Sequence, residues 1–292
     1  MIDFKRYCAE KIELINAYLE NCLKEGSISN IEQAMRYSLL AGGKRLRPLL
    51  LMATVDVVAG KSQQYLPVAA GLEMIHTYSL IHDDLPALDN DDYRRGKLTN
   101  HKVFGEDIAI LAGDALLTAA FECVATQKFV DSQLLVELVG DIAKAAGRLG
   151  MVGGQTLDVQ ANGEFLNCAA LQKMHEGKTG ALFKVAIVSG GKLAGANPEQ
   201  LLALEKFATL YGLVFQITDD ILDVEGEFAD LGKPVGSDVR NGKVTYVSAY
   251  GLQGAKDLVL TLTQEAKAEL NIFGDKAELL IAFLHQLLTR KN

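Results

Sequence analysis

The sequence predicts an all-α protein, built as a single large bundle of about ten or more helices. Three observations favour this class. Apolar residues recur at helical spacing along all 292 residues, only 5 prolines interrupt the chain, and alternating strand-like patterns between turn residues are almost absent. No Ser/Gly/Pro-rich linker divides the chain, so we expect one domain over residues 1–292.

The first half of the chain carries two helix signals and one turn signal. Apolar residues at helical steps, such as Ile15 and Leu19, predict a helix over residues 4–23. The motif Gly42-Gly43-Lys44-Arg45-Leu46-Arg47-Pro48 combines a glycine turn, three cations and a proline suited to a first helical turn. A later helix should stop or kink near Pro86, because proline destabilises a helix interior.

The following helices are more apolar. The segment from Ile108 to Phe121 is apolar nearly all round, so we expect a helix that is buried on most sides. Helical spacing also predicts helices over residues 201–215 and 277–288. A single bundle with central helices accounts for these segments better than two small bundles do.

Composition bounds the function. Apolar residues make up 49% and charged residues 23%, which excludes a disordered or collagen-like chain. A net charge of −8 without a basic tract argues against nucleic-acid binding, and no run of about 18 uncharged apolar residues predicts a membrane span. The four cysteines are Cys8, Cys22, Cys123 and Cys168, which lie far apart in sequence and form no CxxC motif. We therefore expect neither a disulfide framework nor a zinc site, and a reduced, soluble, cytoplasmic protein.

An acidic cluster follows an apolar helix late in the chain. Asp219, Asp220 and Asp223 stand at positions i, i+1 and i+4. On a helix, Asp219 and Asp223 differ by only about 40°, with Asp220 beside them. A metal site and a solvated acidic helix end explain this cluster, taken alone, equally well.

Another acidic cluster, Ile81-His82-Asp83-Asp84-Leu85-Pro86-Ala87-Leu88-Asp89-Asn90-Asp91-Asp92, surrounds Pro86. A regular helix would turn Asp89 about 240° away from Asp83, so the turn after Pro86 must bring it back. Two acidic clusters without cysteine or clustered histidine suit Mg²⁺. Phosphate oxygens commonly complete the coordination shell of this ion. Bridging metal ions would also let an acidic protein hold a polyphosphate.

Basic residues lie where they could help to bind phosphate. Free N–H groups at a helix N-terminus, together with Lys44 and Arg47, form a phosphate site. Each further cation, taken singly, could be a solvated charge. These cations follow the acidic clusters or a glycine turn and are Arg94, Arg95, Lys178, Lys233 and Lys243.

Together, six motifs resemble those of the trans-isoprenyl diphosphate synthase family, and most closely its bacterial farnesyl diphosphate synthases (geranyltranstransferases). They occur in the family's order over nearly the whole chain: GGKRLRP, IHDDLPALDNDDYRRG, GGQTLD, HEGKTG, FQITDDILD and a GK…GK loop. The resemblance implies an all-α bundle around a deep central cavity, a homodimer, and three Mg²⁺ ions per active site, with Mn²⁺ as a substitute.

The resemblance also implies the reaction. Isopentenyl diphosphate would condense with dimethylallyl or geranyl diphosphate to farnesyl diphosphate by ionisation, condensation and elimination. The sequence offers no dedicated general base, and the family's departing diphosphate takes the proton.

Site roles follow by position from the resemblance. The metal ligands would be Asp83, Asp84, Asp89, Asp219, Asp220 and Asp223, with Asp83, Asp89 and Asp219 the principal ones. The isopentenyl diphosphate site would comprise Lys44, Arg47, His76 and Arg95. The allylic diphosphate site would comprise Arg94, Lys178, Thr179, Gln216, Lys233 and Lys243, with Gln155 and Asp158 nearby. The catalytic residues would be Asp83, Asp84, Asp89, Arg94, Lys178, Asp219 and Lys233.

Product length depends on Tyr78 and Ser79 in this reading. Tyr78 stands five residues before Asp83, about 7.5 Å deeper along a helix, where it could floor the channel and stop growth at fifteen carbons. A core tyrosine is the alternative, since Ser79 lies nearer the Asp83 face of the helix.

Three other functions are alternatives to a farnesyl diphosphate synthase. A geranylgeranyl diphosphate synthase would share every motif and differ in the floor around Tyr78. A terpene cyclase would leave Lys44, Arg47 and His76 unexplained, and a non-catalytic subunit of a heteromeric synthase would usually have lost aspartates that are intact here.

Overall fold

The computed structural model describes residues 3–23, 29–161, 168–225 and 245–289. The chain divides into two compact units, of which unit 1 comprises Met1–Met52 and Lys61–Gly140 and unit 2 comprises Ala53–Gly60 and Asp141–Asn292. The divisions fall close to or inside two helices, α3 (Leu46–Val58) and α7 (Ser132–Ala146), which contribute residues to both units. The expected single domain over residues 1–292 stays a prediction.

Unit 1 is almost wholly helical. Besides the start of α3 and most of α7 it contains α1 (Phe4–Cys22), α2 (Ser29–Leu39), the 3-10 helix η1 (Ser62–Tyr65), α4 (Leu66–Asp83), α5 (Asn100–Phe104) and α6 (Glu106–Ala125). A short antiparallel hairpin joins β1 (Tyr93–Arg94) to β2 (Lys97–Leu98), and no other strand lies among the residues that the structure describes.

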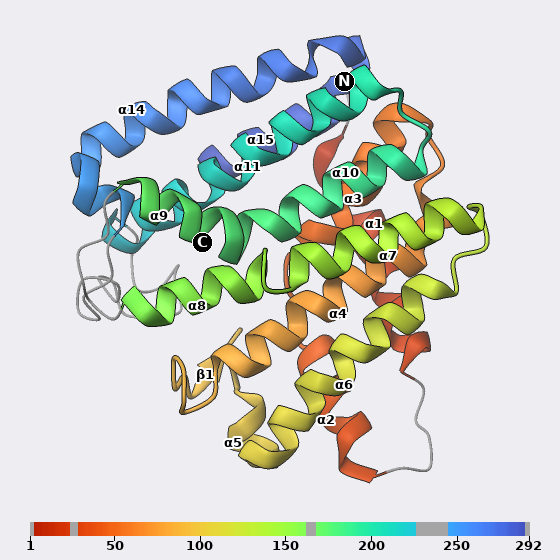
Figure 1. Cartoon of the computed structure of the whole chain (residues 1–292), viewed down its shortest axis with the longest axis vertical. Coiled ribbons are helices and arrows are strands. Elements are labelled where there is room, and N and C mark those ends of the chain that lie inside the picture. The colour runs from red at the N-terminus through yellow and green to blue at the C-terminus, as the bar shows by residue number, and fades with distance from the viewer. Residues whose placement is uncertain (1–2, 24–28, 162–167, 226–244, 290–292) are drawn as a thin grey trace. The chain divides into compact units, whose positions relative to one another are not determined.

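Helices α4 and α6 lie side by side at the centre of unit 1 (Figure 1). Each helix supplies a glycine at the contact. A Cβ atom on Gly71 of α4 would lie 2.9 Å from the Ala120 carbonyl oxygen, and one on Gly113 of α6 would lie 2.2 Å from His82 Nε2. A Cβ atom on Gly71 would force the two backbones apart, and one on Gly113 would displace the His82 ring, so both glycines favour the close approach of α4 to α6.

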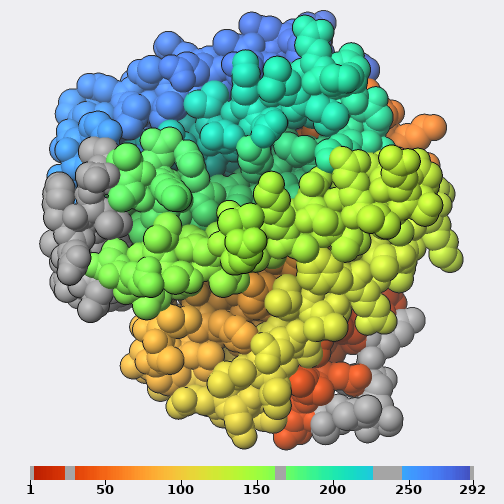
Figure 2. Space-filling view, in the orientation of Figure 1, coloured from red at the N-terminus to blue at the C-terminus, as the bar shows by residue number. Residues whose placement is uncertain are grey.

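The burial expected for residues 108–121 is only partly confirmed. Helix α6 covers this segment and buries Ala112 and Leu116 completely. Ile110 and Leu111, however, are 45% and 51% exposed, because α2, α4 and α5 pack on other parts of the helix and leave these two side chains uncovered. Accordingly, yellow atoms of α6 reach the surface of unit 1 beside α5 (Figure 2).

Unit 2 is organised around one long helix, α11 (Pro198–Glu225). Figure 1 shows α10 and α14 running along it, and α15 and η3 also contact it. The elements of this unit, besides the ends of α3 and α7, are α8 (Met151–Ala161), α9 (Cys168–His175), the π-helical turn η2 (Glu176–Gly180), α10 (Ala181–Leu193), α11, α14 (Tyr246–Glu269), the 3-10 helix η3 (Leu270–Ala277) and α15 (Glu278–Thr289).

The expected helices are confirmed with small shifts of their ends. Residues 4–23 form α1, residues 201–215 lie inside α11, which continues through the second acidic cluster, and residues 277–288 lie in the end of η3 and in α15. Helix α14 begins with a capping box in which Thr245 and Ser248 each accept a backbone N–H of the other residue.

Two helices, α6 and α11, are long and apolar enough to cross a membrane by length and composition alone, although the sequence led us to expect no such segment. A buried core helix meets the same criterion. Half of the apolar window of α11 is buried within the protein, where Phe207 and Tyr211 are fully enclosed.

Candidate functional site

The first acidic cluster forms a tight turn at the end of α4, which ends at Asp83. The N–H of Asp89 donates to the Asp83 carbonyl at 2.8 Å, and the N–H of Asn90 donates to the Leu85 carbonyl at 3.1 Å. This turn returns Asp89 to Asp83, as the sequence predicts. Asp83 is half-buried and Asp89 is exposed, so both carboxylates remain accessible.

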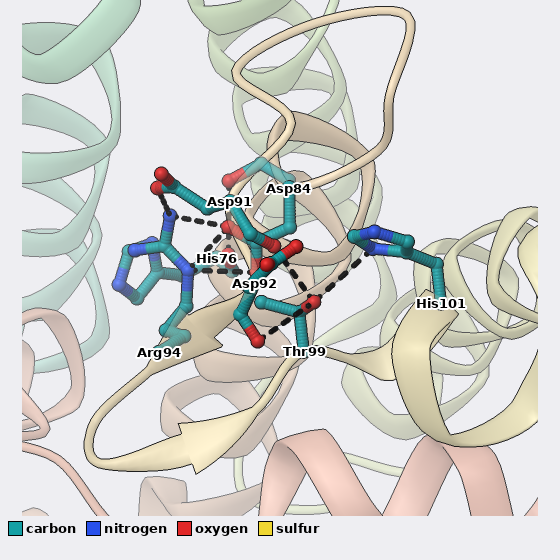
Figure 3. A network of polar contacts seen from close by, with 8 residues as sticks. His76, Asp84, Asp91, Asp92, Arg94, Thr99 and His101 are labelled. Atoms are coloured by element: carbon teal, nitrogen blue, oxygen red, sulfur yellow. Dashed lines mark hydrogen bonds and ion pairs between the residues drawn. The ribbon is translucent and has the colours of Figure 1, made fainter.

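Asp84, between them in sequence, is engaged differently. It is only 3% exposed, and Arg94 Nε lies 2.8 Å from each of its carboxylate oxygens (Figure 3). Burial opposes the charge of Arg94, but its hydrogen bond to Asp84 and the surrounding carboxylates outweigh burial and raise the pKa of Arg94. The geometry thus favours a positioning role for Asp84, while its predicted role as a metal ligand stays a prediction.

The segment between this turn and the hairpin is held by Thr99. Its hydroxyl donates to the Asp91 carbonyl at 2.8 Å and lies 3.2 Å from His101 Nδ1, and its N–H donates to the Asp92 carbonyl at 3.0 Å (Figure 3). Lys102 pairs with the Asp92 carboxylate at 2.7 Å. These contacts fix the base of the hairpin that carries Arg94.

Arg95 is placed by a left-handed hairpin turn. Arg95 and Gly96 both have positive φ, +54° and +73°, as the twist-matched two-residue turns require. Arg95 Nη1 donates to the Gly42 carbonyl. A Cβ atom on Gly43, whose own φ is +122°, would lie 2.6 Å from Arg95 Cζ. The backbone conformation at Gly43 therefore favours glycine, and a larger side chain there would also displace the Arg95 guanidinium.

A buried ion pair that the sequence reasoning missed supports this glycine turn. Arg45 Nη1 lies 2.8 Å from Glu73 Oε1, and both side chains are 1% exposed. Arg45 also donates to the Leu39 carbonyl at 2.8 Å and to Asn16 Oδ1 at 3.0 Å. One signal could have found it, namely the single acid Glu73 inside the apolar first half of α4.

His76 lies among arginines. Burial, and then the charges of Arg47, Arg95, Arg94 and Arg45, lower the pKa of His76 well below its usual range. The imidazole is therefore neutral at pH 7. The structure thus brings together three residues predicted for the isopentenyl diphosphate site, Arg47, His76 and Arg95, and the fourth, Lys44, is exposed on the same glycine turn.

A small cavity of about 30 Å³ lies beside this cluster in unit 1. Arg94, Arg95, Thr77 and Asn100 are among its lining residues. Among the described residues, the Thr77 hydroxyl and the Asn100 side-chain carbonyl find no hydrogen-bond partner. A cavity of this size and polarity accommodates about one water molecule.

A second polar cluster lies within unit 2. Lys178 Nζ pairs with Asp158 Oδ2 at 2.5 Å. The Thr179 hydroxyl donates to Gln216 Oε1 at 3.3 Å, and Gln216 Nε2 donates to Asp220 Oδ1 at 2.9 Å. The structure therefore brings the predicted allylic-site residues Lys178, Thr179 and Gln216 close to one another.

Glycines allow the backbone of η2 to pack against its neighbours. A Cβ atom on Gly154 of α8, next to the half-buried Gln155, would lie 2.0 Å from the Lys178 backbone nitrogen. One on Gly212 of α11 would lie 3.1 Å from the Gly180 Cα atom. The π-helical turn is thus held by α8 and α11, which fixes the position of Lys178. Such turns are common at functional sites.

In the second acidic cluster, as in the first, one aspartate is buried and two are accessible. Asp220 is 3% exposed, and its Oδ2 accepts the Tyr246 N–H at 2.7 Å, at the first residue of α14. Asp219 is exposed and Asp223, one turn further along α11, is half-buried. Each cluster therefore has one buried aspartate that orders a neighbour and two aspartates that stay accessible.

The accessible carboxylates fit Mg²⁺, which takes oxygen ligands only. Within residues 3–23, 29–161, 168–225 and 245–289, no three His, Cys, Asp or Glu side chains gather into a metal-binding group. Mg²⁺ is commonly held by one or two carboxylates, with water and phosphate oxygens completing its coordination shell.

Tyr78, the predicted channel floor, is buried in unit 1. It is 6% exposed, its ring stands edge-on to His82 at a centroid distance of 5.7 Å, and burial raises its pKa to about 12. The neighbouring Ser79 hydroxyl donates to the His76 carbonyl of its own helix at 2.9 Å. The chain-length role of both residues stays a prediction.

Two predicted allylic-site residues, Lys233 and Lys243, lie outside the residues that the structure describes.

Residues 28–275 match the polyprenyl synthetase family. A farnesyl diphosphate synthase of Micrococcus luteus is 48% identical over 276 residues, which cover 94% of each chain. A chloroplastic geranylgeranyl pyrophosphate synthase of Catharanthus roseus is 46% identical over 293 residues, or 99% of this chain and 82% of that one. The crystal structure of an FPP/GFPP synthase from Zymomonas mobilis is similar with a TM-score of 0.89 at 35% identity, over 98% of this chain and 99% of that one.

Proposed function

Because this chain belongs to the polyprenyl synthetase family, and is a trans-prenyltransferase of the farnesyl or geranylgeranyl diphosphate synthase type, we propose that it makes farnesyl diphosphate. Its substrates would be isopentenyl diphosphate and dimethylallyl or geranyl diphosphate. The observation that carries the metal-dependent prenyl transfer is the pair of acidic clusters, each with two accessible aspartates and one buried aspartate that holds a neighbour in place. The choice of farnesyl diphosphate as the product is supported by the buried Tyr78.

In this proposal the accessible aspartates Asp83, Asp89, Asp219 and Asp223 hold Mg²⁺, which neutralises diphosphate charge when it is bound. Arg94 and Lys178 bind the allylic diphosphate and stabilise it as the allylic C–O bond breaks. Cations that are prearranged in this way usually supply the largest part of catalysis. Lys233 and Lys243 would join them.

The isopentenyl diphosphate would bind to the cations of unit 1. Lys44, Arg47 and Arg95 offer charge, and the neutral His76 can offer one N–H donor without adding charge. The double bond of this substrate then attacks the allylic cation, and the carbocation formed by this attack loses a proton to give the product. As the family resemblance implies, the departing diphosphate would take this proton.

Replacing single aspartates tests the metal assignment. Asp83→Ala and Asp219→Ala should each lower turnover by orders of magnitude and leave the helical content unchanged, because neither side chain is buried. Asp84→Asn provides a contrast, since it loosens Arg94 and should chiefly raise the KM for the allylic substrate. Wild-type turnover in both alanine variants would refute the assignment.

Product length is the finer part of the proposal. The buried Tyr78 supports a channel that stops at fifteen carbons, whereas a twenty-carbon product is the alternative and similar proteins of both types exist. Incubation with Mg²⁺, labelled isopentenyl diphosphate and dimethylallyl diphosphate, followed by chromatography of the dephosphorylated products, decides between them. Tyr78→Ala should lengthen the product. No product from any allylic starter would favour a non-catalytic subunit instead.

A homodimer in the cytoplasm completes the proposal. The exposed Ile110 and Leu111 are neighbours on α6, and we propose that they belong to an apolar patch that a second copy covers, since contiguous apolar patches mark interaction sites. Light scattering of the wild type and of an Ile110→Asp/Leu111→Asp variant tests this. A dimer that persists unchanged in the variant would exclude this face.

A further inference from the structure

Two cysteines that stand 101 residues apart in sequence meet in unit 1. Cys22 is the last residue of α1, Cys123 lies in the last turn of α6, and their Sγ atoms are 3.8 Å apart. The spacing of the cysteines in the sequence gave no sign of this contact. The structure leaves both as thiols.

The two thiols differ in environment. Cys22 is exposed, whereas Cys123 is only 6% exposed. A hydrogen bond from Cys123 lowers the pKa of Cys22. Burial opposes this effect, but a further hydrogen bond from Tyr18, one turn earlier on α1, adds to it, and the pKa remains below its usual value. The same contact and then burial raise the pKa of Cys123. In a pair of this kind, the accessible thiol of lowered pKa reacts with the oxidant, and the buried thiol then attacks the oxidised sulfur.

We propose that Cys22 and Cys123 form an oxidation-sensitive pair, which a peroxide converts reversibly into a disulfide between α1 and α6. The Cys22 thiolate attacks one peroxide oxygen, the O–O bond breaks, and Cys22 becomes a sulfenic acid. The other oxygen leaves as hydroxide and becomes water by taking up the proton that the Cys22 thiol released on ionisation. The Cys123 thiol then attacks that sulfur, the S–O bond breaks, and a second water leaves. The two thiols give up two electrons, and the peroxide accepts them.

The required movement is small. A disulfide bond is about 2.05 Å long, so the two sulfur atoms must approach by roughly 1.7 Å. Cys22 is the terminal residue of its helix and its side chain is exposed, so rotation about its Cα–Cβ bond can bring its sulfur closer. Cys8 offers a matched comparison on the same helix, because burial raises its pKa to about 11 and makes its thiolate scarce.

Peptide mapping tests the pair directly. The reduced full-length protein is treated with hydrogen peroxide, alkylated, and digested with trypsin without reduction. Trypsin places every cysteine in a separate peptide, residues 7–11, 12–24, 103–128 and 149–173. We expect one new cross-linked species, formed by residues 12–24 and 103–128, which disappears after dithiothreitol.

Variants separate the steps. Cys22→Ser should abolish the cross-link, and because Cys22 is exposed this variant should fold normally, whereas Cys8→Ser should leave the cross-link intact. In Cys123→Ser, dimedone should trap the sulfenic acid on Cys22. The oxidised wild type should unfold about 5 °C higher than the reduced protein, and Cys22→Ser should show no such shift.

Two results would overturn the proposal. One is that peroxide carries Cys22 of the wild type to sulfinic or sulfonic acid without the cross-linked peptide. The other is a covalent dimer on a non-reducing gel, which would show that Cys22 pairs with a second chain rather than with Cys123.

Discussion

Replacing Glu73 by glutamine should destabilise the protein by about 3 kcal/mol, the lower end of the range for a broken buried ion pair. Glutamine keeps the volume of glutamate, so no cavity forms, and the variant removes only the charge that lies 2.8 Å from Arg45 Nη1. The lower end applies because Arg45 keeps two neutral acceptors, the Leu39 carbonyl and Asn16. Denaturant titration followed by far-UV circular dichroism measures the loss, which corresponds to a fall of roughly 5 °C in the thermal midpoint.

A surface ion pair of nearly the same length is the matched control. Lys184 Nζ lies 2.7 Å from Glu205 Oε1, but the two side chains are 43% and 49% exposed. Glu205→Gln should therefore cost less than about 1 kcal/mol, since water solvates both charges. If Glu73→Gln and Glu205→Gln lost the same stability, burial would not set the strength of the Arg45–Glu73 pair and the reasoning would be refuted.

Three further predictions concern the candidate site. Gly43→Ala should raise the KM for isopentenyl diphosphate about tenfold with kcat largely kept, because its Cβ displaces Arg95; steady-state kinetics check this, and an unchanged KM would contradict it. Asp220→Asn should speed hydrogen exchange at the Tyr246 amide, where Asp219→Asn should not, as mass spectrometry or NMR can measure. Because the pKa of His76 in the folded protein lies below its unfolded value of about 6.5, the unfolded chain takes up the proton first, and the free energy of unfolding should fall as the pH drops below about 6.5. In His76→Gln, the free energy of unfolding should depend less on pH between about pH 7.5 and about pH 5.5 than it does in the wild type. The same pH dependence in the variant and the wild type would contradict the assignment of this effect to His76.

The sequence predicts local geometry well where one helix or one turn decides it. The return of Asp89 to Asp83 followed from the proline and the angle of a helix, and α11 carried the second acidic cluster where the apolar spacing put it. These features depend on residues a few positions apart, so a single segment contains all the information needed.

Features that depend on contacts between distant segments could not be predicted. Asp83 and Asp84 are neighbours in sequence, and nothing in the sequence distinguishes their roles. They differ in the folded chain because Arg94 on the hairpin binds Asp84. The same holds for Ile110 and Leu111, because the composition of α6 does not tell which of its sides other helices cover. The pairing of Arg45 with Glu73 likewise needs two segments that meet only in the folded chain.

The anchoring of the two hairpin arginines has a consequence for ligand affinity. A long cationic side chain loses up to about 2 kcal/mol of rotamer entropy when a ligand immobilises it. Arg94 is already held by Asp84, and Arg95 by Gly42, before any diphosphate arrives. Most of that entropy is lost when the chain folds, so binding depends on how firmly the hairpin is held. A substitution that loosens it, even one remote from the ligand, should weaken affinity through entropy rather than through a lost contact.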